Sequence, residues 1–146
     1  MSDLRIEQVD SDASLLDWQH VHNLIIPTAL LSLDDIRERA QRNVLEVAYV
    51  GDVLVGCSTI RPPSDETPAA TVIARILPEY RRQGHGKALY ERCLVRAQAF
   101  EAPAIETIIL ASNVDGLRFA EARGFVQLET YLLPGDTIPF VTLRLP

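Results

Sequence analysis

Seven short segments of the chain are rich in apolar residues, either alternating with polar ones or accompanied by β-branched neighbours, a pattern typical of β-strands. Short turns join two pairs of these segments into predicted β-hairpins, Gly51-Asp52 in the middle of the chain and Pro134-Gly135-Asp136 near its end. The predicted strands cover residues 4–9, 44–50, 53–60, 70–77, 105–111, 125–133 and 138–145.

Four further segments repeat apolar residues every three or four positions, which predicts helices with one buried face. Residues that cap helices precede the first two, Asp10-Ser11-Asp12 and Ser32. The predicted helices run from residues 10–12 to Pro27, from Ser32 to about residue 43, over 84–102 with a stripe of Leu89, Cys93, Ala97 and Phe100, and over 115–123 with Gly124 as C-cap. The order β-α-α-β-β-β-α-β-α-β-β predicts one α+β domain spanning residues 1–146.

The composition is ordinary for a globular protein, with 47% hydrophobic and 23% charged residues. The net charge of −6 argues against nucleic acid as the main partner, because phosphate backbones attract clustered Lys and Arg. No apolar run approaches the roughly 20 residues of a membrane span, and residues 1–5 lack a signal-peptide pattern. We therefore expect a cytoplasmic protein without membrane contact. Cys57 and Cys93 form no ligand or redox motif, so we expect both to be buried and inert, with no metal bound.

The segment from Arg81 to Lys87 reads Arg-Arg-Gln-Gly-His-Gly-Lys and joins a predicted strand to a predicted helix. Its glycines let the backbone turn tightly and approach a ligand closely. The first N–H groups of a helix have no acceptor within it and lie at the positive end of its dipole. With three accompanying cations, this arrangement predicts a phosphate or pyrophosphate site. It is neither a Walker loop, because Ala88 follows the lysine, nor a dinucleotide fingerprint, because Leu89 stands at the third glycine position.

This segment follows Ile76-Leu77-Pro78-Glu79-Tyr80. Together they resemble the acetyl-CoA loop of the GNAT N-acetyltransferase superfamily, a strand, then Pro-x-x-[Arg/Gln]-x-x-Gly-x-[Gly/Ala], then a helix. A second match lies downstream, where Ala111-Ser112-Asn113 precedes a helix that ends in Ala120-Glu121-Ala122-Arg123-Gly124-Phe125. In GNAT proteins this region forms the other wall of the CoA groove, and the order of elements is also that of the GNAT fold.

The resemblance implies a mixed, mostly antiparallel sheet of about seven strands, splayed between the fourth and fifth, with about four helices. It implies transfer of an acetyl group from acetyl-CoA to the amine of a small-molecule or peptide acceptor, by direct attack in a ternary complex. Backbone groups of the splayed strands need a partner, which the peptide-like pantetheine arm can supply. The residues implied in acetyl-CoA binding are Ala74, Arg75, Ile76, Arg81, Arg82, Gln83, Gly84, His85, Gly86, Lys87 and Asn113.

The chain departs from the family at its catalytic acid and base. Many members carry a tyrosine seven residues after the asparagine, where this chain has Ala120, and a carboxylate on the fourth strand, where residues 71–74 offer no proton acceptor. Tyr131 is the first candidate for a substitute acid; the further candidates for either role are Glu46, Tyr49, His20 and His22. Because a thioester is already activated, reaction without a protein acid stays open. So do a non-catalytic acyl-CoA-binding or regulatory domain, and a likeness to one half of tandem GNAT enzymes.

Three residues carry expectations about their surroundings. Arg75 is a cation in an apolar strand, so we expect it to pair with Glu46 or Glu106, or else to recognise a carboxylate on the acceptor. His85 is expected to face solvent, and Asn113 to cap a helix as well as to contact pantetheine. The apolar residues 25–31 are expected to cover the acceptor, and the terminal hairpin offers an edge through which a homodimer can form.

Overall fold

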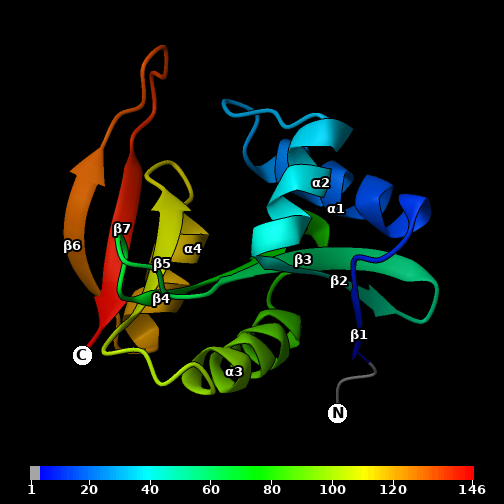
Figure 1. Ribbon diagram of the computed structural model, residues 1–146. Coiled ribbons are helices and arrows are strands. Elements are labelled where there is room, and N and C mark those ends of the chain that lie inside the picture. Colours follow the sequence, from blue (N-terminus) through cyan, green and yellow to red (C-terminus); the bar gives the residue numbers. More distant parts are fainter. Residues whose placement is uncertain (1–3) are drawn as a thin grey trace.

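The computed structural model describes residues 4–146, which form one seven-stranded sheet in the order β1-β2-β3-β4-β5-β7-β6, with four helices (Figure 1). Neighbouring strands are antiparallel except β4 and β5, which run parallel, as predicted. Residues 1–3, on which the signal-peptide prediction partly depends, lie outside the described part. The strands are β1 (Leu4–Gln8), β2 (Val44–Val50), β3 (Val53–Arg61), β4 (Ala70–Ile76), β5 (Ile105–Leu110), β6 (Val126–Tyr131) and β7 (Phe140–Leu145). The helices are α1 (Asp12–Ile25), α2 (Leu33–Arg42), α3 (His85–Gln98) and α4 (Val114–Ala122), with a 3₁₀ turn η1 over Pro78–Tyr80.

The helices form one layer on each face of the sheet. On the first face, α1 and α2 pack over β2 and β3 through Trp18, Val21, Ile36, Leu45, Val47 and Cys57. On the second face, α3 and α4 pack through Leu89, Cys93, Ala120, Val72, Ile76 and Leu143, and Figure 1 shows α3 on the opposite side from α1 and α2. Cys57 and Cys93 are both buried and free, and burial raises the pKa of their thiols to about 12 and about 11. Both are buried, as predicted, and their inertness stays a prediction that the raised pKa values favour.

The first two helices begin where their capping residues predict. The Ser11 hydroxyl accepts from the Ser14 N–H, and the Ser14 hydroxyl accepts from the Ser11 N–H in return. Ser32 and Asp35 form the same reciprocal pair at the start of α2. These capping boxes satisfy N–H groups that have no acceptor within the helix, so the chain enters each helix at a defined residue.

The third helix is shorter than its apolar stripe predicts. It ends at Gln98, and the chain then turns, with the Glu101 backbone in the left-handed region at φ 55°. Phe100 consequently lies beyond the helix and is 39% exposed, so its predicted place in the buried stripe is wrong. The other three residues of the stripe, Leu89, Cys93 and Ala97, are fully buried.

The two parallel strands at the centre of the sheet separate soon after they meet. They pair at Ala70–Ile105 and Thr71–Glu106, and no pairing between them follows along the described part of either strand. β5 continues against β7, whereas β4 continues against β3 (Figure 1). This is the predicted splay, and it leaves one edge of each strand without a strand partner. Within residues 4–146, each helix is too short or insufficiently apolar to cross a bilayer.

Candidate functional site

A cavity of about 520 Å³ occupies the space where β4 and β5 diverge. It extends from the glycine loop between β4 and α3 to the C-terminal end of α1, where Ile25 and Ile26 line it. The cavity therefore reaches both faces of the sheet. The predicted site residues that line it are Ala74, Arg75, Ile76, Arg81, Arg82, Gly84, Gly86, Lys87 and Asn113, while Gln83 and His85 of the same loop do not.

The glycine loop presents free backbone amides to this cavity. Gly84 is the N-cap of α3 and has φ 85°, a left-handed conformation that suits glycine. The helical hydrogen bonds begin with the Ala88 N–H, which donates to the Gly84 carbonyl at 3.2 Å. The N–H groups of His85, Gly86 and Lys87 therefore lie in the open first turn, at the positive end of the helix dipole. This is the arrangement that suits an anion, and the phosphate site itself stays a prediction.

The three cations of the loop differ in their surroundings. The Arg81 guanidinium donates through Nε to the Ile76 carbonyl at 2.8 Å and lies 3.5 Å from Asp115 of α4, so it ties the loop to β4 and α4. Arg82 lies 4.0 Å from the same Asp115 and its side chain is 86% exposed. Lys87 is also exposed and lies 4.0 Å from Glu91. Arg81 is therefore a structural tie, whereas Arg82 and Lys87 can move toward a phosphate.

The free edge of β4 supplies a second set of backbone groups. The Leu77 N–H donates to the Val55 carbonyl at 2.8 Å. Because hydrogen bonds in an antiparallel ladder alternate from residue to residue, the N–H and C=O groups of Ala74 and Ile76 point away from β3, toward β5. The Ile76 carbonyl is occupied by Arg81. Both N–H groups and the Ala74 carbonyl are thus placed to pair with an extended ligand.

Asn113 lies across the cavity from this edge and caps α4. Its side-chain Oδ1 accepts from the Gly116 N–H at 3.0 Å. A Cβ on Gly116 would lie 2.7 Å from the Asn113 side-chain nitrogen, so the cap requires glycine at that position. The predicted capping role is confirmed. Asn113 also lines the cavity, which leaves its amide nitrogen near a ligand.

Two expectations about neighbouring residues are wrong. His85 is buried, with 9% exposure, because α3 turns its side chain inward rather than toward solvent. Arg75 pairs with neither Glu46 nor Glu106. Glu46 faces Ser58, which faces Ala74, so its side chain lies on the opposite face of the sheet from that of Arg75. Glu106 shares the face of Arg75 but bonds to its cross-strand partner Arg144 at 2.5 Å.

Two of the proposed acid and base candidates are held in structural interactions. Glu46 is fully buried and accepts hydrogen bonds from Arg92 at 3.0 Å and Arg96 at 3.1 Å. The Tyr49 hydroxyl donates to Asp17 at 2.5 Å, and burial together with that bond raises the Tyr49 pKa. Neither residue lines the cavity. Both are therefore poor candidates for proton transfer to an acetyl donor.

The remaining candidates lie on the first face of the sheet. His20 is exposed, whereas His22 is buried, stacks on Trp18 and lies 3.0 Å from Asn23 through Nδ1. Burial, followed by the nearby Arg75 charge, lowers the His22 pKa to about 4, so the ring is neutral at pH 7. Tyr131, at the end of β6, stacks on Phe140, and burial raises its pKa. Its phenol is thus protonated at neutral pH, as a proton donor must be, but Tyr131, like Glu46 and Tyr49, does not line the cavity.

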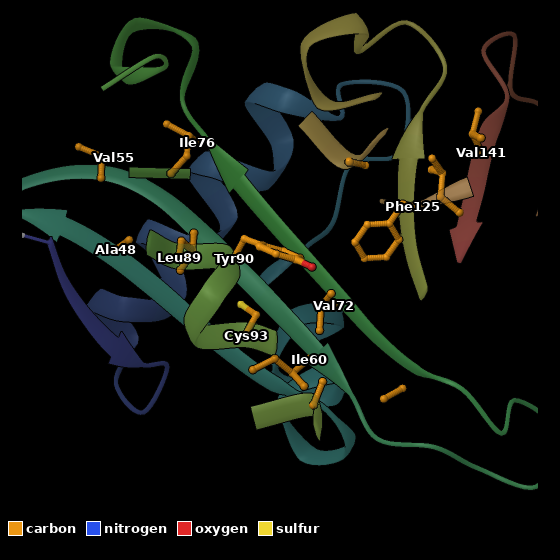
Figure 2. Close-up of a cluster of buried hydrophobic side chains, with 14 residues drawn as sticks. Ala48, Val55, Ile60, Val72, Ile76, Leu89, Tyr90, Cys93, Phe125 and Val141 are labelled. Atoms are coloured by element: carbon orange, nitrogen blue, oxygen red, sulfur yellow. The ribbon is translucent and has the colours of Figure 1, made fainter. Parts of the chain in front are cut away.

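Several residues lining the cavity were not predicted from the sequence. Tyr90 of α3 contacts Phe119 and Phe125 edge to face, with ring centroids 5.8 and 6.0 Å apart. In Figure 2 its side chain points from α3 along β4 toward Phe125. Tyr90 directly follows the stripe residue Leu89, and its ring reaches the cavity beside Phe119 of α4 and Phe125. The other residues in this group are Thr107, Arg118 and Arg123, and Ala120 lines the cavity where a tyrosine was expected from the family pattern.

Comparison with protein families gives one result that covers most of the chain. Residues 10–125 match the model of the acetyltransferase (GNAT) family. No curated protein matches the sequence.

Solved structures with similar folds cover nearly the whole chain. The yncA protein of Salmonella typhimurium, solved with its cofactor acetyl-CoA, has a TM-score of 0.77 and 14% identity, and the match covers 99% of this chain and 94% of that one. NAA60 of Arabidopsis thaliana, in complex with a bisubstrate analogue, has a TM-score of 0.77 and 14% identity, and the match covers 97% of this chain and 96% of that one. The ribosomal-protein-S18-alanine N-acetyltransferase of Escherichia coli has a TM-score of 0.75 and 17% identity, and the match covers 98% of this chain and 93% of that one. At these identities, the likeness establishes the fold.

Proposed function

The chain belongs to the GNAT acetyltransferase family, and we propose that it transfers the acetyl group of acetyl-CoA to the amine of a small-molecule or peptide acceptor, by direct attack in a ternary complex. One observation carries this proposal. The cavity between β4 and β5 joins the open amides of the glycine loop to an opening beside α1 on the first face of the sheet. A donor can enter from one face and an acceptor from the other.

Acetyl-CoA would bind along this cavity in two parts. The pyrophosphate would accept from the amides of His85, Gly86 and Lys87, with Arg82 and Lys87 adding charge. The pantetheine arm would extend along the free edge of β4 and pair with Ala74 and Ile76, as an added strand does. Asn113 would contact it from the side of β5 and α4.

The reaction itself needs few protein groups. The amine nitrogen attacks the thioester carbonyl carbon, so that a C–N bond forms and the C–S bond breaks, and the CoA sulfur leaves with the electron pair. A backbone N–H at the end of β4 would donate to the carbonyl oxygen as negative charge develops there. Alignment of two bound reactants can supply roughly 7–11 kcal/mol of the barrier. Positioning is therefore the main contribution that we assign to this site.

Two further changes accompany the transfer: the amine nitrogen loses a proton, and the departing CoA sulfur carries a negative charge. The amine loses its proton to water, and a thiolate, whose thiol has an ordinary pKa near 8.5, leaves without needing an acid. Ala120 offers no proton, and Tyr131 is the hydroxyl to test as a substitute. We propose that the reaction proceeds without a protein acid. Replacing Tyr131 by phenylalanine tests this proposal, because Tyr131 is the candidate for that role.

We further propose that the protein acts in the cytoplasm and forms a homodimer through the edge strand β6. Val126 and Leu128 on that strand are 58% and 52% exposed, an unusual apolar content for a free edge. Sedimentation of the wild type beside a Leu128→Lys variant tests the dimer. A monomer at all concentrations contradicts it.

Calorimetry with acetyl-CoA and an assay of CoA release with a panel of amines test the activity. Binding with turnover supports the proposal. Binding without turnover on a broad panel would instead support the non-catalytic acyl-CoA-binding alternative, which the missing tyrosine and carboxylate favour. No binding of acetyl-CoA would overturn both.

A further inference from the structure

Two arginines project from the first face of the sheet, the face that α1 and α2 cover, and the charge of Arg75 acts on Arg61. Arg75 of β4 faces Cys57 of β3, and Cys57 belongs to the buried cluster under these helices. Arg61 lies four residues beyond Cys57 on the same strand, so its side chain projects from the same face. Arg39 of α2 is close enough for its charge to act on both.

Neither Arg61 nor Arg75 forms a hydrogen bond or ion pair with a carboxylate within residues 4–146. The Arg61 Nε is buried and has no partner at all among the described residues. The groups that act most on Arg61 are Arg39, Tyr131, Arg75 and Arg42, none of them a carboxylate. Burial, and after it the neighbouring arginine charges, lower the pKa of Arg61.

The nearby acidic groups are committed elsewhere. Glu46 lies on the other face with Arg92 and Arg96, and Glu106 is bound by Arg144. Arg39 has Asp35 and Glu38 on its own helix to offset its charge, but Arg61 and Arg75 have no such neighbours. Asp136, in the loop between β6 and β7, has a buried Oδ2 without a partner, yet it is not among the groups that act on either arginine. Partly buried cations without a counter-charge are costly, so the cluster favours an external anion.

The two arginines lie on the face of the sheet opposite the glycine loop, so an anion bound there would belong to the acceptor and not to CoA. Residues of β4 alternate between faces, so Val72 and Ile76 pack against α3 and the glycine loop, whereas Arg75 points to the opposite face. Arg75 nevertheless lines the cavity, beside Ile25 and Ile26 of α1. His22 adjoins Arg75 and is neutral at pH 7, so it adds no charge of its own.

We infer that the acceptor is an amine that also carries a carboxylate, an amino acid or similar amino carboxylic acid, whose carboxylate binds Arg61 and Arg75 on the first face of the sheet. This inference rests on the proposed acetyl transfer. The carboxylate would lie at the acceptor mouth of the cavity, which Arg75 lines and beyond which Arg61 lies on the same face, and the amine would be directed between β4 and β5 toward the thioester. Guanidinium groups suit this role because they bind carboxylates with two parallel hydrogen bonds.

Matched acceptors test the inference. Each of the twenty amino acids is compared with its carboxamide and with the decarboxylated amine of the same side chain, by CoA release. Because hydrogen bonds to a charged group are stronger than those to a neutral one, the expected kcat/KM for the best amino acid is at least about 100-fold above that of its amide. Arg61→Met and Arg75→Met should each lose at least about tenfold of that preference, and Arg61→Met, which lies outside the cavity lining, should leave the Kd of acetyl-CoA unchanged. Arg37→Met, an exposed arginine on α2, should keep it.

Measurements of melting temperature and of product binding provide two further tests of the inference. The Cys57 thiol is a hydrogen-bond partner of Arg75, so the stability test uses Arg61→Met. Because the Arg61 Nε is buried without a partner among the described residues, the melting temperature of this variant should equal or exceed that of the wild type; a fall of several degrees would reveal an internal partner and overturn the inference. Equal turnover of acids and amides by the wild type would also overturn it. If no amine is turned over, N-acetyl amino acids and their amides are titrated into the CoA-loaded protein. Tighter binding of the acids supports the inference, and equal or absent binding overturns it, whereas failure to bind acetyl-CoA overturns the proposed function instead.

Discussion

Replacing Gly86 by valine tests whether the backbone of the glycine loop holds a phosphate. Gly86 lies in the first turn of α3 and lines the cavity. A Cβ at this position would lie 3.6 Å from Ile76 Cγ1 and 3.8 Å from Phe119 Cε2, which is ordinary van der Waals contact. Its φ is not in the left-handed region, unlike that of Gly84. The folded protein should therefore accept the substitution, and the two added methyl groups should fill space beside the free amides.

The expected loss of affinity follows from the hydrogen bonds that the side chain prevents. A hydrogen bond to a charged group contributes roughly 1.5–3 kcal/mol. If valine keeps the pyrophosphate from two of the amides, the loss is about 3–6 kcal/mol, or about 10²–10⁴-fold in the Kd of acetyl-CoA. Gly86→Ala, with one added carbon, should lose less. Calorimetry measures the Kd, and thermal melting shows that each variant is folded.

Ala88→Val is the matched control for this substitution. It places the same β-branched side chain two residues further along α3, where the N–H already donates to Gly84 and the residue does not line the cavity. Its acetyl-CoA affinity should equal that of the wild type. An unchanged Kd in folded Gly86→Val protein would refute the phosphate site, and equal losses in both variants would point to disruption of the helix. Pantetheine without phosphate should lose less affinity than acetyl-CoA, since the contacts are to phosphate.

Three further substitutions separate structural from chemical roles. Glu46→Gln should lower the free energy of unfolding, measured in urea, by about 3 kcal/mol. This is the lower end of the range for a broken buried ion pair, because both arginine partners of Glu46 are partly exposed. The acetyl-CoA affinity should not change, and a loss of kcat at unchanged stability would instead identify Glu46 as a base. His22→Gln should flatten stability against pH between 6.5 and 4. In the wild type the unfolded chain binds a proton at His22 at a higher pH than the folded chain does, so the folded state loses about 3 kcal/mol of stability as the pH falls from 6.5 to 4. The same dependence of stability on pH in the wild type and the variant would contradict the lowered His22 pKa. Tyr131→Phe should retain kcat and raise the KM of the acceptor, because the hydroxyl lies near the Arg61 charge; a loss of kcat by about 10²-fold or more would identify Tyr131 as the acid.

The features predicted correctly from the sequence depend on residues close together in the chain. Ser11 and Ser32 begin helices through hydrogen bonds to residues three positions on, so the sequence contains the whole interaction. The glycine loop is equally local, since its amides belong to consecutive residues. The end of α3 could not be predicted in this way, because Glu101 adopts a left-handed conformation without the glycine that usually signals it.

The features predicted wrongly depend on which residues become neighbours in three dimensions. Glu46 and Arg75 both lie on central strands, and only the register through β3 shows that they point to opposite faces. His85 is polar and sits in a loop sequence, but the direction of α3 buries it. Tyr90 lines the cavity where its ring contacts Phe119 of α4 and Phe125, and no spacing within α3 indicates those contacts.

The arginine cluster gives a physical reason for one departure from the family pattern. A carboxylate base on β4 that pointed to the first face would lie among Arg61, Arg75 and Arg39. There it would pair with a guanidinium, which would lower its basicity and neutralise the anion site. This face can therefore hold arginines that are free to bind an external anion, or a carboxylate base, but not both. If the acceptor supplies the carboxylate, its amine must lose its proton to water, which accords with a β4 strand whose one ionisable side chain is an arginine.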